Sequence, residues 1–95
     1  MRSPRANLFI QRVAANVARL RVAKGLTQER LAEVAEIAPR SIQRIERAAQ
    51  DLSISALVSV ADALAVHPSA LLKPARLAPA RPGRPAGRKP GASRR

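Results

Sequence analysis

The sequence contains no cysteine and only one histidine, His67, among its 95 residues. Without cysteine the chain can form neither a disulfide nor a thiolate metal site, which suits a reducing cytoplasm. A single histidine leaves too few ligand types for zinc, so we expect no metal and no cofactor. We also find no paired carboxylates, no activated nucleophile and no phosphate loop. The sequence therefore predicts a protein that is not an enzyme.

Long apolar segments are also missing. Asn7, Gln11 and Arg12 interrupt the apolar residues near the N-terminus, so no secretory signal is recognisable. The most apolar stretch, residues 53–66, is too short to span a bilayer and contains Asp62. We therefore expect a soluble cytoplasmic protein that does not span a membrane.

Acidic residues are scarce, with 6 Asp and Glu against 18 Lys and Arg and a net charge of +12. Residues 74–95 carry seven positive charges and no negative one, and residues 1–73 carry 11 positive and 6 negative charges. This excess predicts a polyanionic partner, of which DNA is the first candidate and an anionic membrane surface the competing one. A charge excess that only aids solubility is the third interpretation.

The composition divides the chain into three parts. Residues 74–95 hold five of the eight prolines and three of the four glycines, and Leu77 is their only large apolar side chain. Such a segment cannot bury enough apolar surface to offset the entropy lost on ordering. We expect a flexible N-terminal arm at 1–7, a folded domain at 8–73 and a disordered basic tail at 74–95.

Apolar periodicity and stop signals predict five helices and no strand, and hence an all-α domain. The helices are expected from about Leu8 to Lys24, from Gln28 to about Ala35, from Pro39 to Arg47, from after Ser53 to about Leu64, and briefly from Pro68. Asn7 and Thr27 are expected to cap the first two helices, and His67 to act as a cap or loop residue. Gly25 stands where a left-handed residue would end the first helix.

The third predicted helix carries two distinct faces. Its polar face holds Arg40, Gln43, Arg44 and Arg47. Ile42 and Ile45 point the opposite way, toward a core. A basic helix face is most often merely solvated, but here a three-residue turn joins the helix to a capped partner. That arrangement is typical of a recognition helix held out for the major groove of DNA.

The residues from 26 to 72 carry the motifs of a known family. The matching motifs are Leu26-Thr27-Gln28-Glu29, Leu31-Ala32, Ile42 with Ile45-Glu46-Arg47, and Leu57 with Ala61-Asp62-Ala63-Leu64. On these motifs the chain resembles the phage-repressor helix-turn-helix family, also called lambda-repressor-like, Cro-type or Xre. The resemblance implies a compact five-helix domain that binds double-stranded DNA and no membrane, in a protein of bacterial or phage type.

The resemblance also implies roles for individual residues. Base edges would be read by Arg40, Ser41 and Arg44, with Gln43 either joining them or binding a phosphate. Phosphates would be bound by Thr27, Gln28 and Arg47. A structural ion pair would join Arg21 to Glu46. Arginine suits the base-reading positions because its guanidinium can bind guanine through two hydrogen bonds.

The chain departs from the family pattern at three turns. Where family members usually have glycine, this sequence has Glu36, Ala48 and Ala65. A left-handed conformation at Glu36 would cost on the order of 1 kcal/mol. We therefore expect the turn between the second and third helices to be wound slightly differently. Pro39 also replaces a side chain that family members often use for base readout.

The basic tail is expected to contact DNA through Arg81, Arg84, Arg88 and Lys89. Its Gly83-Arg84-Pro85 triplet resembles an AT-hook, which lies in a narrow minor groove. Nonspecific attraction to phosphates and a merely solvated extension are the two alternatives, because tails of this composition produce such triplets easily.

Two further questions stay open in the sequence. Leu71 and Leu72, with Val66, either form a homodimer contact or close the core of one monomer. The function we expect is a sequence-specific transcriptional regulator, a repressor that binds its operator as a homodimer. One alternative is a low-specificity, nucleoid-associated DNA-binding protein. The other is an antitoxin-type module that binds a protein partner through its tail.

Overall fold

The computed structural model describes residues 2–76, so Met1 and residues 77–95, with the predicted tail contacts, lie outside the described part. It contains the α-helices α1 (Pro4–Ala23), α2 (Gln28–Ala35), α3 (Pro39–Glu46) and α4 (Ile54–Ala63), and the 3-10 helix η1 (Pro68–Leu72). The described residues include no strand, which confirms the all-α prediction. No helix among them is long and apolar enough to cross a membrane.

The first helix begins earlier than predicted. The Ser3 hydroxyl accepts a hydrogen bond of 3.0 Å from the Ala6 N–H, and Pro4 occupies the first turn, where proline is favoured. Residues 4–7 of the expected arm are therefore helical, and the prediction that Asn7 caps α1 was wrong. Apolar periodicity could not detect this turn because its side chains are exposed or only half-buried.

The predicted fifth α-helix is a 3-10 helix instead. His67 caps it, since its ring Nδ1 accepts a 3.1 Å hydrogen bond from the Ser69 N–H. The Ala70 N–H then bonds to the His67 carbonyl three residues back, at 2.9 Å. Such tight winding is common in pieces this short. The domain thus has four α-helices rather than the five predicted.

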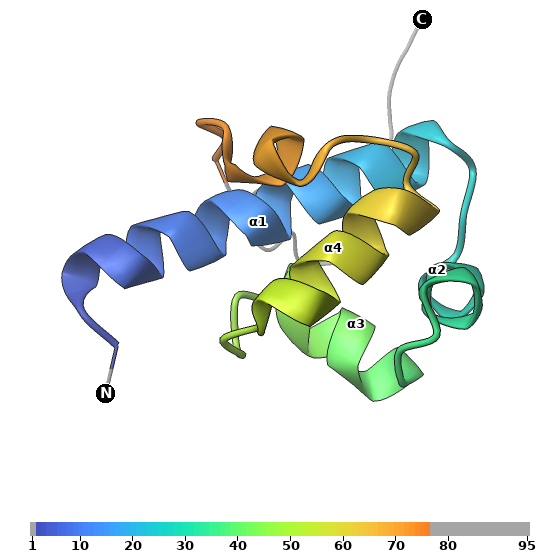
Figure 1. Ribbon diagram of the computed structural model, residues 1–95, viewed down its shortest axis with the longest axis horizontal. Coiled ribbons are helices and arrows are strands. Elements are labelled where there is room, and N and C mark those ends of the chain that lie inside the picture. The colour runs from blue at the N-terminus through green and yellow to red at the C-terminus, as the bar shows by residue number, and fades with distance from the viewer. Residues whose placement is uncertain (1, 77–95) are drawn as a thin grey trace, which may run out of the picture.

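Every element contributes a side chain with no exposed surface to a single core. These side chains are Val17 of α1, Leu31 of α2, Ile42 of α3, Val60 of α4 and Leu71 of η1. α1 packs against α3 and η1, and α4 packs against α2 and η1 (Figure 1). α3 lies at the edge of the bundle, so one of its faces meets the core and the other meets solvent.

All four α-helices end in the same hydrogen-bonded turn. A residue just after each helix has a left-handed backbone, and these residues are Gly25, Glu36, Ala48 and Ala65, with φ between 56° and 72°. At the end of α2, the Glu36 N–H bonds to the Glu33 carbonyl at 3.2 Å, and the Ile37 N–H bonds to the Ala32 carbonyl at 3.0 Å. This pair of bonds is the Schellman motif.

The expectation that the turn at Glu36 is wound differently was wrong. Glu36 takes the left-handed conformation with φ of 59°, although it is not glycine. Two observations explain how it is held there. The Schellman bonds satisfy carbonyls at the end of α2, and the Ile37 side chain packs against the core. Together they offset a backbone strain of about 1–2 kcal/mol.

Candidate nucleic-acid interface

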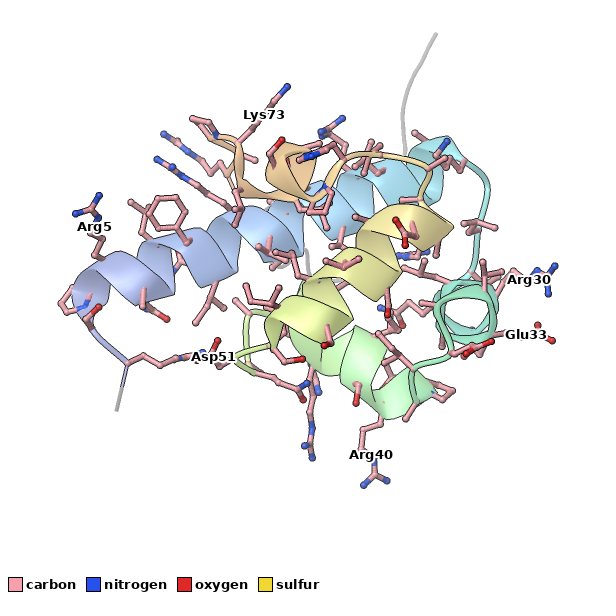
Figure 2. The ribbon with its side chains drawn as sticks, viewed as in Figure 1. Arg5, Arg30, Glu33, Arg40, Asp51 and Lys73 are labelled. Carbon is pink, nitrogen blue, oxygen red and sulfur yellow. The ribbon has the colours of Figure 1, made fainter. Side chains whose placement is uncertain are left out.

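The orientation of α3 follows from its two isoleucines. Ile42 is 0% and Ile45 is 2% exposed, so both anchor the helix in the core. The opposite face consists of Arg40, Gln43, Arg44 and Arg47, all exposed, with Ser41 half-buried beside them. In Figure 2 the Arg40 side chain points away from the body of the domain. The structure thus brings the predicted base-reading residues together on one side of the helix.

The polar side chains of this face are free within the domain. Among residues 2–76, none of the side chains of Arg40, Gln43, Arg44 or Arg47 forms a hydrogen bond or an ion pair with another residue. Each guanidinium carries five N–H donors and no acceptor. The face therefore offers a dense set of donors to any anionic or carbonyl-rich ligand.

A nearly buried ion pair holds α3 in place. Arg21 Nε donates to Glu46 Oε2 at 2.6 Å, and Arg21 Nη2 donates to Glu46 Oε1 at 3.1 Å. The two side chains are 16% and 7% exposed. Arg21 Nη1 also donates to the Leu26 carbonyl at 2.7 Å. The pair that the family resemblance implied is thus present, and it fixes α3 to α1.

Gln28 takes part in the same network, which the sequence did not reveal. Its amide Nε2 donates to Glu46 Oε1 at 3.0 Å, so α2 is joined to α3 through Glu46. One of its two amide hydrogens is therefore used inside the protein. Thr27 Oγ1 accepts from the Arg30 N–H at 3.0 Å and caps α2 as predicted. The first N–H groups of α2 have no partner within the helix and face the N-terminal side.

The helix pair has the dimensions that a DNA groove requires. Residues 36–38 form the turn between α2 and α3, and α3 is eight residues long. An α-helix with its side chains is about 10–12 Å in diameter. The major groove of B-form DNA is about 12 Å wide and admits one helix. The exposed half of α3 can therefore enter it while Ile42 and Ile45 stay in the core.

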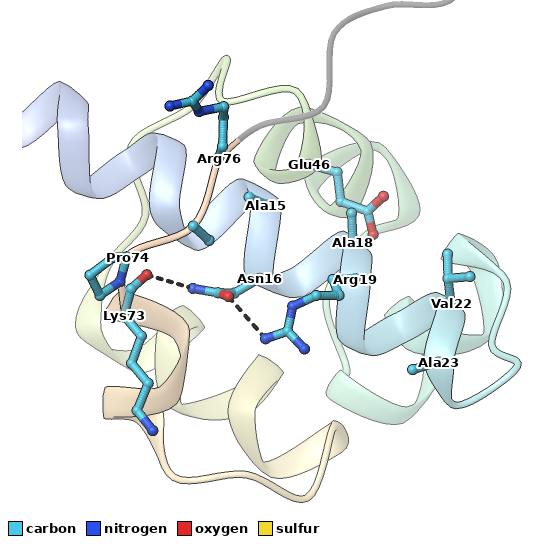
Figure 3. A pocket seen from close by; sticks show the side chains of 11 residues that line it. Ala15, Asn16, Ala18, Arg19, Val22, Ala23, Glu46, Lys73, Pro74 and Arg76 are labelled. Carbon is cyan, nitrogen blue, oxygen red and sulfur yellow. Dashed lines mark hydrogen bonds between the residues drawn. The ribbon is translucent and has the colours of Figure 1, made fainter.

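Asn16 is an important polar residue that our sequence analysis missed. Only 1% of it is exposed. Its Nδ2 donates to the Leu71 carbonyl at 3.0 Å. Nδ2 also donates to the Lys73 carbonyl at 3.0 Å, and Oδ1 accepts from Arg19 Nη2 at 3.1 Å, as Figure 3 shows. The signal that was available is its position between the buried Val13 and Val17 of α1. Through these bonds Asn16 holds the chain that follows η1 against α1.

These features define a class of protein. Two short helices joined by a three-residue turn, with free arginines on the second, make a helix-turn-helix domain of the kind that binds nucleic acid. The chain belongs to the helix-turn-helix family HTH_3, whose model matches residues 17–71. This match supports the prediction that the protein is not an enzyme.

Two curated relatives align with about two thirds of the chain. Over 64 residues it is 36% identical to an uncharacterized HTH-type transcriptional regulator of Rickettsia conorii, covering 63% of this chain and 51% of that protein. A second such regulator, from Rickettsia prowazekii, is also 36% identical over 64 residues and is covered to 49%. The chain thus spans about half the length of the curated relatives it matches.

Solved structures share the fold as well. The restriction-modification controller protein C.AhdI of Aeromonas hydrophila superposes with a TM-score of 0.63 at 29% identity, over 65% of this chain and 94% of that one. The clp gene regulator ClgR of Corynebacterium glutamicum gives 0.65 at 29% identity, over 68% and 69%. A hypothetical transcription factor from Neisseria gives 0.69 at 29% identity, over 73% and 78%.

Proposed function

We propose that this protein is a sequence-specific regulator of transcription that binds double-stranded DNA. α3 enters the major groove, where Arg40, Ser41 and Arg44 contact base edges. Gln43, at the border of the same face, contacts either a base or a phosphate. The observation that carries this proposal is the free arginine face of α3, opposite two isoleucines that anchor the helix. The regulators among its relatives support it.

Contacts with the DNA backbone would position the domain. Arg47 stands at the far end of α3, where its guanidinium reaches a phosphate beside the groove. Thr27 and Gln28 open α2, and the free N–H groups of its first turn favour an anion there. Such contacts set the register of a protein on DNA without reading its sequence. A domain docked in this way excludes other proteins from the same site, which favours a repressor.

We propose further that the protein binds its operator as a homodimer, because one small module covers little DNA. Leu71 is fully buried and closes the core of the monomer, so it is no dimer contact. Val66 is half-buried against the core. Leu72 is 37% exposed, and it lines a shallow apolar groove together with Phe9 and Ile54. This groove is the surface we assign to the second copy.

Selection of binding sites from a random DNA pool tests the function. The full-length protein should enrich one sequence with two-fold symmetry, and the Arg40→Ala/Arg44→Ala variant should enrich none. Arg30→Ala is the matched control, because Arg30 is an exposed arginine of α2 that pairs with Glu33. It should enrich the same site as the unchanged protein. If the unchanged protein enriches no sequence, the proposal fails.

The same experiment separates a second candidate function. A cytoplasmic, nucleoid-associated protein of low specificity would bind every duplex in the pool alike. The net charge of +12 favours this candidate, since attraction to phosphates is independent of sequence. Equal recovery of all sequences, with no loss in the Arg40→Ala/Arg44→Ala variant, would favour it over a specific regulator.

A further inference from the structure

The positive charge of this protein is concentrated outside the helix-turn-helix unit. All 6 acidic residues lie in residues 29–62, together with only four basic ones. Residues 1–28 and 63–95 contain the other 14 of the 18 Lys and Arg residues and no acidic one. The segment that holds α2, α3 and α4 is therefore slightly acidic. The basic excess belongs to α1, to the residues next to its two ends and to the residues that follow η1.

On α1 the arginines form a single row. Arg5, Arg12 and Arg19 are seven residues apart, so each is rotated by only about 20° from the one before. Along the helix axis they are spaced by about 10 Å. Arg5 and Arg19 are exposed, and Arg12 is half-buried with its guanidinium 4.9 Å from the centre of the Phe9 ring. α1 thus presents a row of positive charge to solvent.

This row points away from α3. Arg21 follows Arg19 by two residues and is therefore turned by about 200° around α1. Arg21 reaches Glu46 of α3, so the face that carries Arg19 lies on the opposite side of the helix. In Figure 2, Arg5 and Lys73 lie at the upper left of the domain and Arg40 at its lower edge. A duplex held by the free face of α3 would therefore lie on the other side of the domain from Arg5 and Lys73.

The chain after η1 adds charge to the same side. Asn16 binds the Lys73 carbonyl at 3.0 Å and so holds this segment against α1. Arg19, Lys73 and Arg76 line one groove beside Ala15 and Asn16, and Glu46 of α3, whose carboxylate is paired with Arg21, also lines it (Figure 3). We call Arg5, Arg12, Arg19, Lys73 and Arg76 the second basic face. Six more basic residues follow Arg76 in the sequence.

We propose that the second basic face binds a second DNA duplex, so that one protein molecule bridges two duplexes. Three positive charges at intervals of about 10 Å can lie along the surface of a duplex, which carries one negative charge for about every 1.7 Å of its axis. A membrane-bound helix would need a broad apolar stripe beside its basic one. The apolar stripe of α1, with Val13 and Val17, is instead buried in the core.

A bridging assay with the full-length protein tests this proposal. One short duplex is immobilised on beads, and a second, fluorescent duplex of unrelated sequence is offered in solution. We expect the protein to retain the second duplex. In the variant Arg5→Gln/Arg12→Gln/Arg19→Gln, retention should fall by about tenfold, and its logarithmic salt dependence by about 0.9 for each phosphate that is no longer neutralised. Arg30→Gln, which removes one exposed charge from α2, should bridge like the unchanged protein.

Binding of the triple variant to one duplex, followed by fluorescence anisotropy, completes the test. The affinity of the variant for one duplex should stay within about twofold of that of the unchanged protein, because α3 is unchanged. Circular dichroism of the variant checks that its helices are still formed. The proposal is overturned if the triple variant still bridges, since a dimer or the tail would then link the duplexes. It is overturned equally if the variant loses binding to a single duplex, or if the unchanged protein retains anionic vesicles but no second duplex.

This inference rests on the proposed function only in using α3 for the first duplex. The sequence-specific function and the bridging of two duplexes would fail in different experiments. If no site is enriched from a random pool, the sequence-specific function is wrong, while bridging between two arbitrary duplexes is still measurable.

Discussion

Arg21 of α1 and Glu46 of α3 are joined by two hydrogen bonds, of 2.6 and 3.1 Å, through adjacent nitrogens of one guanidinium. Both residues are nearly buried, and Glu46 lies between Ile45 of the core and Arg47 of the exposed face. The pair therefore fixes the rotation of α3 about its own axis. That rotation decides which side chains of α3 face outward.

Removal of one partner should destabilise the domain. Arg21→Ala leaves the Glu46 carboxylate with Gln28 alone, and we expect a loss of about 2–4 kcal/mol in the free energy of unfolding. Urea denaturation followed by circular dichroism measures it. The double variant Arg21→Met/Glu46→Leu should recover most of the loss, because two apolar side chains need no partner. A double variant as unstable as Arg21→Ala would contradict this account.

Asn16 should be essential for the C-terminal part of the domain. Asn16→Ala leaves the carbonyls of Leu71 and Lys73 without their donor, which should cost about 1–3 kcal/mol. Faster amide hydrogen exchange at Ala70 and Leu71 than in the core of α4 would localise the effect to η1. Gln11→Ala, an exposed change one turn earlier, is the control and should leave stability within about 0.5 kcal/mol. An equal effect of the two changes would argue against a structural role.

Glycine should stabilise the turns that end α2, α3 and α4. At Glu36, Ala48 and Ala65 the left-handed backbone is strained, with φ of 59°, 56° and 60°. Substitution by glycine removes a strain of about 1–2 kcal/mol from the folded state. It also raises the entropy of the unfolded state, which costs a smaller free energy. Each change should therefore increase the free energy of unfolding by about 0.5–1 kcal/mol. Thermal melting curves measure it, and the melting temperature of each glycine variant should rise. Ala18→Gly, inside α1, should have the opposite effect, of about 1 kcal/mol.

Two arginines of α3 should differ in what they do for binding. Arg44→Ala should cost about 1–3 kcal/mol at the selected site and relax the preference at one base position. Arg47→Ala should weaken binding to all sequences alike and reduce the logarithmic salt slope by about 1. Anisotropy titrations on matched and mismatched duplexes, at several salt concentrations, distinguish the two patterns. The same uniform loss in both variants would make Arg44 a phosphate contact.

The residues after Arg76 should add affinity without changing the preferred site. A chain ending at Arg76 lacks six basic residues, including Arg81, Arg84, Arg88 and Lys89. Its binding should be weaker and less dependent on salt, by about 0.9 in logarithmic slope for each phosphate that the tail would have neutralised. The cut is placed after Arg76 so that Lys73, whose carbonyl Asn16 binds, keeps the residues that follow it. A changed site preference would reveal that the tail reads DNA.

Much of the fold was predictable because local patterns specify it. Thr27 caps α2, Pro39 begins α3 and Gly25 ends α1, as their residue types indicated. The start of α1 was missed, although Ser3-Pro4 is a strong local signal, because its first turn is exposed and has no apolar pattern. The winding of η1 was misjudged since a few residues cannot show whether a short helix winds as α or 3-10.

The residues of the candidate site were predictable from the sequence, but the long-range contacts that hold the site in place were not. Arg40, Arg44 and Arg47 are four and three residues apart, so they share one face of an α-helix. The isoleucines on the opposite face predict that the arginines point to solvent. The bond from Gln28 to Glu46 joins residues 18 apart, and the bonds from Asn16 to the carbonyls of Leu71 and Lys73 span more than 50 residues. No local pattern reports such contacts.

By itself, then, the amino-acid order determined the helices, their buried stripes and the basic face of α3, because each depends on residues within a turn or two of one another. The tertiary structure decided the rest. It selected the left-handed backbone at Glu36, the burial of Asn16 and Leu71, and the packing of α3 against the side of α1 that carries Arg21. Those outcomes depend on free energies of packing and hydrogen bonding between distant segments, which exist only once the helices have come together.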